Sequence, residues 1–157
     1  MKRLIVLAMA VAALVVCGSS AAATTAPKAK QVIQELAAHG LPAHLTVVYT
    51  AATDPNHLLG RPNGYLSKAS FSDRRVSSSD TEGDTKGDVD FGGSVEVFSS
   101  ASGAKRRAAY IESMEKALPI LGTEYDYLNG PVLLRVSQDL TPTQAKGYQR
   151  ALAKLKV

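Results

Sequence analysis

The segment Glu124-Tyr-Asp-Tyr-Leu-Asn-Gly-Pro-Val-Leu-Leu-Arg-Val136 carries the strongest local fold signal in the chain. Two runs rich in aromatic and β-branched residues flank Asn129-Gly130, a dipeptide that readily adopts the positive φ angles of a type I′ turn. The segment therefore predicts an antiparallel hairpin with a two-residue loop. The loop sets the register, in which Tyr127 faces Val132.

Helices are predicted on both sides of this hairpin. Thr141-Pro-Thr-Gln144 is a capping box with Pro at the first helical position, and apolar residues follow it at helical spacing. Gly103–Leu118 shows a similar periodicity and ends before Pro119. A third helix is predicted at Lys30–His39, where Gly40 ends it, and strands are predicted at Leu45–Thr50, Tyr65–Phe71 and Ser94–Phe98.

This order of elements predicts one α+β domain covering residues 30–157. The hairpin requires antiparallel neighbours, and each predicted helix has a single apolar side to bury. We expect an antiparallel sheet of about four to five strands with three helices packed mainly on one face.

The N-terminus has the pattern of an export signal. Met1-Lys-Arg is followed by the apolar run Leu4–Val16 and then by Cys17, the only cysteine. Leu14-Val-Val-Cys17 resembles the bacterial lipobox. We therefore expect residues 1–16 to be a signal peptide, Cys17 to carry lipid and residues 17–29 to form the attachment site and a flexible tether. The protein would be extracytoplasmic, anchored to the outer face of the cell membrane.

Two alternatives follow from Val16, which is bulkier than the small residue usual before a lipobox cysteine. In the first alternative, Leu4–Val16 is an uncleaved anchor, although this run falls short of the roughly 20 residues that span a bilayer. Alternatively, cleavage near Ala21–Ala23 would release a secreted protein without Cys17.

Three segments carry a resemblance to a known group of proteins. Asn56–Lys68, Gly92–Phe98 and Glu124–Ser137 are similar to segments of small secreted lipoproteins of actinobacteria and their phages. The similarity covers most of the mature chain. It implies an envelope location but no catalytic residue, because no activity is established for that family.

Composition narrows the classes of partner. Lys2 and Arg3 belong to the predicted signal, so 16 of the 18 basic residues remain against 14 acidic ones. No basic stripe stands out beyond Lys105-Arg-Arg107, and we predict no nucleic-acid partner. A single cysteine excludes an intrachain disulfide, and no cofactor motif is recognised.

No arrangement of residues typical of catalysis or metal binding is present. His39, His44 and His57 are scattered without zinc-site spacing, and no serine lies in a nucleophile elbow. Ser77–Asp90 contains five carboxylates, but it lacks the EF-hand pattern and is predicted to be a solvated, mobile surface loop. We therefore assign no catalytic residue and no metal ligand.

The segment Asn56–Tyr65 is the predicted contact surface, because Pro and Gly restrain it and it carries Arg61 and Tyr65. Arg and Tyr are frequent anchors of interfaces. The sequence thus favours a non-enzymatic binding module that contacts a protein or an envelope component. The alternative is a small secreted hydrolase with a site near His57.

Overall fold

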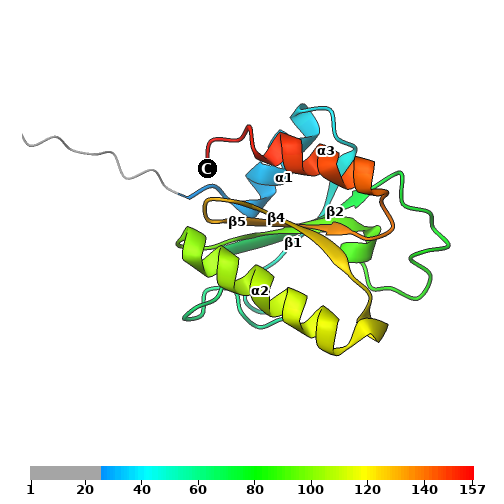
Figure 1. Cartoon of the computed structure of the whole chain (residues 1–157). Coiled ribbons are helices and arrows are strands. Elements are labelled where there is room, and N and C mark those ends of the chain that lie inside the picture. Colours follow the sequence, from blue (N-terminus) through cyan, green and yellow to red (C-terminus); the bar gives the residue numbers. More distant parts are fainter. Residues whose placement is uncertain (1–25) are drawn as a thin grey trace, which may run out of the picture.

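A computed structural model describes residues 26–157 (Figure 1). Cys17 and the expected signal peptide lie outside these residues. The elements are α1 (Ala29–Ala38), β1 (Ala43–Val48), β2 (Ser67–Asp73), η1 (Val89–Phe91), β3 (Gly92–Val97), α2 (Ala101–Ala117), η2 (Pro119–Leu121), β4 (Glu124–Asn129), β5 (Val132–Ser137) and α3 (Pro142–Leu152). None of the helices in this part of the chain combines the length and apolar character needed to cross a membrane.

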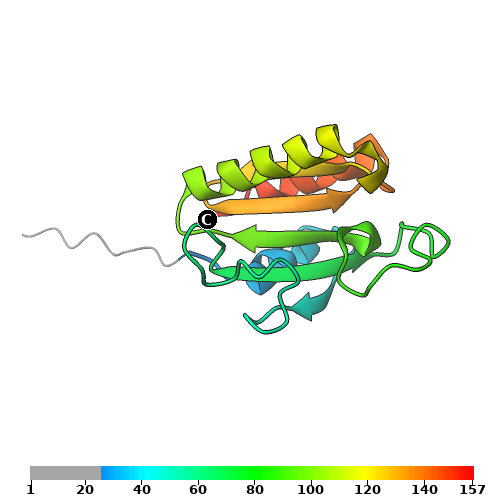
Figure 2. The same ribbon diagram turned by 90° about the horizontal axis from the view of Figure 1, so that it is seen from below.

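The five strands form one antiparallel sheet in the order β1-β2-β3-β5-β4, which confirms the α+β class. Helices α1 and α3 lie together on one face, as expected for most of the helices. Helix α2 lies alone on the opposite face (Figures 1 and 2). The sheet is therefore covered on both sides, and each side has its own core.

The two cores differ in size and chemistry. The core under α1 and α3 contains apolar side chains from every strand, including Phe71, Val95 and Leu134. The core under α2 contains only Tyr65, Phe98, Ala104, Ile111 and Leu133. The rest of the sheet face beneath α2 is occupied by polar and charged side chains, and this region forms the candidate site.

The expected helix ends are confirmed. Thr141 caps α3 through a capping box with Gln144. At the end of α1, the N–H groups of Gly40 and Leu41 donate to Ala37 and Leu36 at 2.9 and 3.3 Å, which is a Schellman motif.

The predicted hairpin forms, but the prediction of a type I′ turn at Asn129-Gly130 is wrong. Asn129 pairs with Val132, so the turn residues are Gly130 and Pro131. A turn centred on Asn129-Gly130 needs the N–H of residue 131 to close it, and proline has none. The Asn129 side-chain amide donates to the carbonyl oxygens of Leu152, the last residue of α3, and of Leu155, which follows the helix, at 2.8 and 3.0 Å.

The change in register leaves the two faces of the hairpin as expected. Tyr127 pairs with Leu134 rather than Val132, which is a displacement of two residues along β5. Since strand side chains alternate with a period of two, such a displacement keeps every side chain on its face. Tyr125 and Tyr127 accordingly pack against the core under α1 and α3.

We expect Gly130→Ala to lower the free energy of unfolding by about 1 kcal/mol, because Gly130 has a φ of +52°. An added Cβ would lie 3.4 Å from Val157, an ordinary contact, so the loss would come from the backbone. Urea denaturation measures this loss in the free energy of unfolding. The matched control is Gly147→Ala in α3, where a Cβ lies 3.5 Å from Leu41 and helix propensity should add about 0.5 kcal/mol. Equal stability of Gly130→Ala and wild type would contradict the turn geometry.

Candidate functional site

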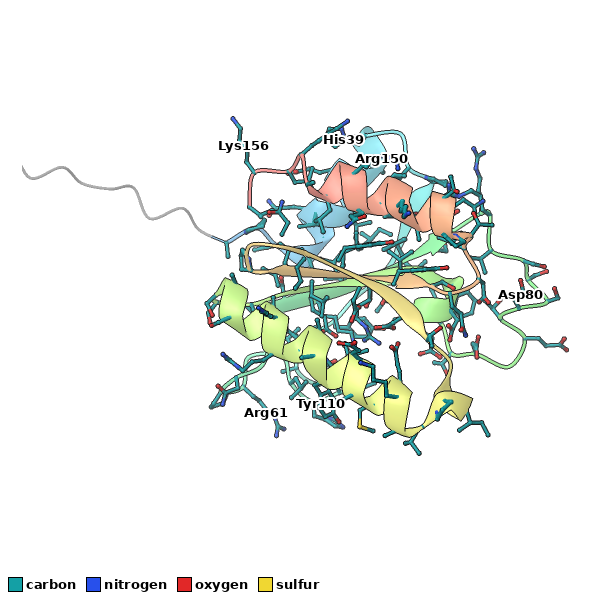
Figure 3. All side chains as sticks on the ribbon, in the orientation of Figure 1. His39, Arg61, Asp80, Tyr110, Arg150 and Lys156 are labelled. Carbon is teal, nitrogen blue, oxygen red and sulfur yellow. The ribbon has the colours of Figure 1, made fainter. Side chains whose placement is uncertain are left out.

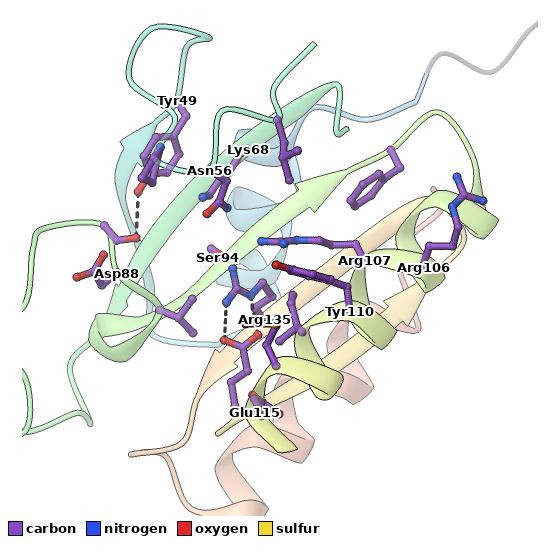
Figure 4. Close-up of a pocket in the computed structure, with 18 of the residues that line it drawn as sticks. Tyr49, Asn56, Lys68, Asp88, Ser94, Arg106, Arg107, Tyr110, Glu115 and Arg135 are labelled. Atoms are coloured by element: carbon purple, nitrogen blue, oxygen red, sulfur yellow. Dashed lines mark hydrogen bonds and ion pairs between the residues drawn. The ribbon is translucent and has the colours of Figure 1, made fainter. Parts of the chain in front are cut away.

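A cleft of about 810 Å³ lies between α2 and the sheet, and we call it the α2 cleft. Strands β2, β3 and β5 form its floor, α2 forms one wall, and residues 49–63 form the other. The turn η1 and the start of β4 close one end. Figure 4 shows Arg107 and Tyr110 extending side by side from α2 into this space, with Lys68 and Asn56 across from them.

The floor of the cleft is organised around a buried carboxylate, that of Glu96 on β3. Its side chain is fully buried and accepts from Arg107 Nε at 3.0 Å and Arg135 Nη1 at 3.4 Å. Arg135 also donates to both carboxylate oxygens of Glu124, at 2.6 and 2.8 Å. Bidentate pairing of this kind holds a guanidinium in one orientation. The two arginines are thereby fixed relative to the sheet.

Asp54 organises the opposite wall. Its carboxylate accepts from the N–H groups of Leu58 and Leu59 at 2.8 and 3.0 Å, and from the Tyr65 hydroxyl at 2.6 Å. Burial alone would raise the pKa of Asp54, but these hydrogen bonds and the nearby Lys68 ammonium outweigh burial and lower it to about 2. Asp54 therefore stays ionised and fastens the loop to β2.

Lys68 lies between these two networks and is only 5% exposed. Its Nζ is 3.4 Å from Asp54 Oδ1 and 4.7 Å from the centre of the Tyr49 ring. The Asn56 amide, oriented so that its oxygen faces the surrounding donors, accepts from Lys68 Nζ and from Arg107 Nη2, both at 3.1 Å. Burial lowers the pKa of Lys68, although Glu96 and Asp54 favour its charged form. An ammonium has three N–H donors, so among residues 26–157 one is left without a hydrogen-bond acceptor.

Ser94 on β3 adds a second unused polar group to the lining. The residue is 1% exposed, and among residues 26–157 its hydroxyl has no hydrogen-bond partner. A buried hydroxyl without a partner costs free energy, commonly 1–3 kcal/mol in proteins. The cost makes the cleft a better candidate for ligand binding than for stability alone.

Carboxylates gather at the end of the cleft near η1. Burial and the neighbouring acidic groups raise the pKa of Asp90 and of Glu115. Asp126, which pairs with Arg135 across the strands, has its pKa raised to about 8 by burial and by Glu124. The raised pKa of Asp126 means that burial beside Glu124 disfavours its charged form.

Tyr65 does not act as the surface contact that the sequence predicted. It is fully buried under α2, donates to Asp54, and packs edge-to-face on Phe98 with ring centres 5.9 Å apart. The strand predicted at Tyr65–Phe71 begins only at Ser67, and the chain before it is irregular. Tyr65 therefore lies in the core under α2, whereas Ala69 and Phe71 lie in the core under α1 and α3. The prediction was wrong because a tyrosine in a turn-rich segment was assumed to be exposed.

Arg61 is exposed, and Figure 3 shows it pointing away from the body of the domain. It does not line the α2 cleft, and its role as a partner contact stays a prediction. Asn63, in the same loop, does line the cleft and has a φ of +64°.

His57, the centre of the hydrolase alternative, is exposed and has a φ of +52°. Within the described residues its ring forms no hydrogen bond with a serine or a carboxylate. The structure therefore adds no support to a hydrolytic site there.

The acidic segment Ser77–Asp90 is mainly exposed, as expected, but its C-terminal end is attached to the sheet. The Gly87 carbonyl accepts from Tyr49 at 3.0 Å and from Ser70 at 2.7 Å. In residues 26–157, no group of three His, Cys, Asp or Glu side chains is placed to hold a metal ion. The attached end forms part of the cleft wall.

The sequence analysis missed the charged floor of the cleft. Lys68, Glu96 and Arg135 alternate with apolar residues on their strands, a pattern that is equally typical of a sheet face open to water. The sequence of α2 contained one signal, a narrow apolar stripe. In the structure this helix buries only Gly103, Ala104 and Ile111. A helix with so narrow an apolar stripe is suited to cover a largely polar surface.

Comparison with known proteins gave no relative from which a function could be transferred. The chain matches no protein-family model, no curated protein and no solved structure. The resemblance to lipoproteins of actinobacteria and their phages therefore stays a prediction, and the function has to be argued from the site.

Proposed function

We propose that this protein is a membrane-anchored, extracytoplasmic lipoprotein whose folded domain is a non-enzymatic binding module. Its ligand occupies the α2 cleft. The observation that carries the proposal is the buried charged floor of the cleft, with partly unused donors on Lys68 and Ser94. Apolar residues would serve stability at least as well at such positions, since burying ion pairs is costly. Binding explains why polar groups are placed there.

The chemistry of the cleft favours binding over catalysis. Although burial opposes it, pairing with Glu124 and Glu96 raises the pKa of Arg135, so its guanidinium does not exchange protons at neutral pH. The Glu96 carboxylate is held by both Arg107 and Arg135. Of the groups that the structure describes, none is a base within hydrogen-bonding distance of Ser94, so the partner that activates a serine nucleophile is missing there.

The proposal is tested with protein-free extracts of the host envelope. We expect such an extract to raise the melting temperature of the purified full-length protein by a few degrees, because a ligand stabilises the folded state that binds it. Tyr110→Ala should remove the shift, since Tyr110 is 56% exposed and lines the cleft. Lys105→Ala, on the same helix but outside the cleft lining, should keep it. Equal shifts in both variants would place the site elsewhere.

The membrane anchor is tested separately. We expect Cys17→Ala to move the protein from the membrane fraction to the soluble extracytoplasmic fraction, because the lipid would no longer be attached. Fractionation followed by immunoblotting measures the change. Ser19→Ala in the adjoining segment is the control and should stay in the membrane. If Cys17→Ala remains as membrane-bound as wild type, an uncleaved Leu4–Val16 anchor replaces the lipoprotein assignment.

A further inference from the structure

The cationic side chains of the α2 cleft are matched by acidic ones. Its lining contains four basic residues, Lys68, Arg106, Arg107 and Arg135, and four acidic residues, Asp88, Asp90, Glu115 and Glu124. Lys68, Arg107 and Arg135 already contact the carboxylates of Asp54, Glu96 and Glu124. Arg106 is left in the lining with the carboxylates of Asp88, Asp90 and Glu115, so no excess positive charge remains to offset the desolvation of an anionic ligand. The cleft is therefore better suited to a ligand without net charge than to an anion.

The unused hydrogen-bonding groups are of mixed type. In the described part of the chain, residues 26–157, Lys68 retains an N–H, and Arg107 donates from Nε and Nη2 but has no partner at Nη1. Ser94 offers a hydroxyl that can both donate and accept. A ligand that meets all three groups has to carry several polar atoms, spaced along it, that both accept and donate. Alcohol groups have this property.

Apolar surface lies next to these polar groups. Tyr110, Ile111 and Met114 line the cleft from neighbouring turns of α2, and Tyr49 lines it from the opposite wall. Tyr110 is 56% exposed, and its ring is available beside the Arg107 guanidinium, which lies 5.6 Å from the ring centre. Such a surface accepts the C–H face of a ring whose hydroxyl groups point outward to the polar groups. The volume of about 810 Å³ lies within the range of small-ligand sites and leaves room for more than one ring.

We infer that the α2 cleft binds a neutral saccharide. This inference rests on the proposed binding function and names its ligand class. The Lys68, Arg107 and Ser94 side chains hydrogen-bond the sugar hydroxyls, and Tyr110 packs against a ring face. The source is either a free sugar or a segment of a glycan chain, and both present the same chemistry to the cleft.

The experiment is isothermal titration of the purified full-length protein with five probes, each at a low and a high salt concentration. Glucose represents a free sugar, and two neutral trimers, triacetylchitotriose and maltotriose, represent glycan segments. Inorganic phosphate and dialanine are the charged controls, tested as an anion and as a zwitterion. We expect at least one saccharide to bind with an affinity that does not change with salt, because screening acts on ionic ligands and not on neutral ones. Glucose binding as tightly as the trimers would indicate a free sugar as the source.

Variants show that the binding occurs in the cleft. We expect Tyr110→Ala and Arg107→Leu each to weaken saccharide binding about tenfold, the effect of losing one good contact. Lys105→Ala should bind like wild type. Circular dichroism melting confirms that each variant is folded, and Tyr110→Ala tests the site even if Arg107→Leu unfolds.

The outcomes separate this inference from the proposed function. If no saccharide binds, or if only phosphate or dialanine binds with strong salt dependence, the saccharide inference is wrong. A Tyr110-dependent shift with envelope extract would still support the binding module in that case. If the extract also gives no Tyr110-dependent shift, both the ligand class and the binding function fail.

Discussion

Glu96→Gln is expected to lower the free energy of unfolding by about 3 kcal/mol, the lower end of the effect of breaking a buried ion pair. Glu96 is fully buried, and its carboxylate accepts from both Arg107 and Arg135. Glutamine keeps the volume but removes the charge, so the two guanidinium groups lose their shared counterion. The arginine side chains are 12% and 16% exposed, and water therefore offers them only limited relief.

Urea denaturation of the purified protein measures this loss, and the variant with an exposed ion pair is the control. Glu112 is bound to Lys116 on the outer surface of α2, and both side chains are mostly exposed. Glu112→Gln should leave the unfolding midpoint unchanged, because exposed pairs contribute little. Similar midpoints for the two variants would show that Glu96 does not hold the arginines as described.

Asp54→Asn is expected to lower the free energy of unfolding by about 3 kcal/mol and to change its dependence on pH. The asparagine amide would present N–H groups to donors that now share a carboxylate, namely the Tyr65 hydroxyl and the N–H groups of Leu58 and Leu59. It would also leave the buried Lys68 without its charged partner. Both effects act on the same wall of the cleft.

The pH dependence follows from the pKa of Asp54, which is lowered from 3.8 to about 2 in the folded state. A lowered pKa favours the folded state above the unfolded pKa, so the contribution is fully present above pH 3.8 and is lost as the pH falls towards 2. Its size is about 2 kcal/mol. Denaturation at several pH values should show a smaller loss of stability on acidification in Asp54→Asn than in wild type.

Asp80→Asn is the control for this experiment. Asp80 is exposed in the acidic segment Ser77–Asp90, and within residues 26–157 its carboxylate accepts only from the neighbouring Ser79 hydroxyl, at 3.3 Å. It should unfold like wild type at each pH. If Asp54→Asn also matches wild type between pH 2 and 4, the carboxylate is not held by the Tyr65 hydroxyl and the loop N–H groups.

Local sequence signals were sufficient for most helices and strands. The capping box at Thr141 and the glycine after α1 mark helix ends through hydrogen bonds within a few residues, so they can be read without knowing the fold. The side chains of the hairpin alternate between faces for a similarly local reason. The turn was the exception, although the missing N–H of Pro131 could have been recognised in the sequence.

The position of α2 and the character of the site depended on contacts between distant segments. Lys68 and Glu96 have the spacing of residues on a solvent-facing side of a sheet, and the same spacing results when a helix covers that side. Tyr65 was misjudged for a related reason, since its burial depends on Asp54, Phe98 and α2 together.

The sequence by itself determined the order of the elements, the antiparallel hairpin and the α+β class, because periodicity, caps and turns act over a few residues. The tertiary structure alone decided that α2 covers the second face and that Glu96 is enclosed with Arg107 and Arg135. Whether a polar side chain faces water or a cleft is a property of what packs over it. In this protein the covering element, α2, lies at a different place in the chain from the strands that carry Lys68 and Arg135.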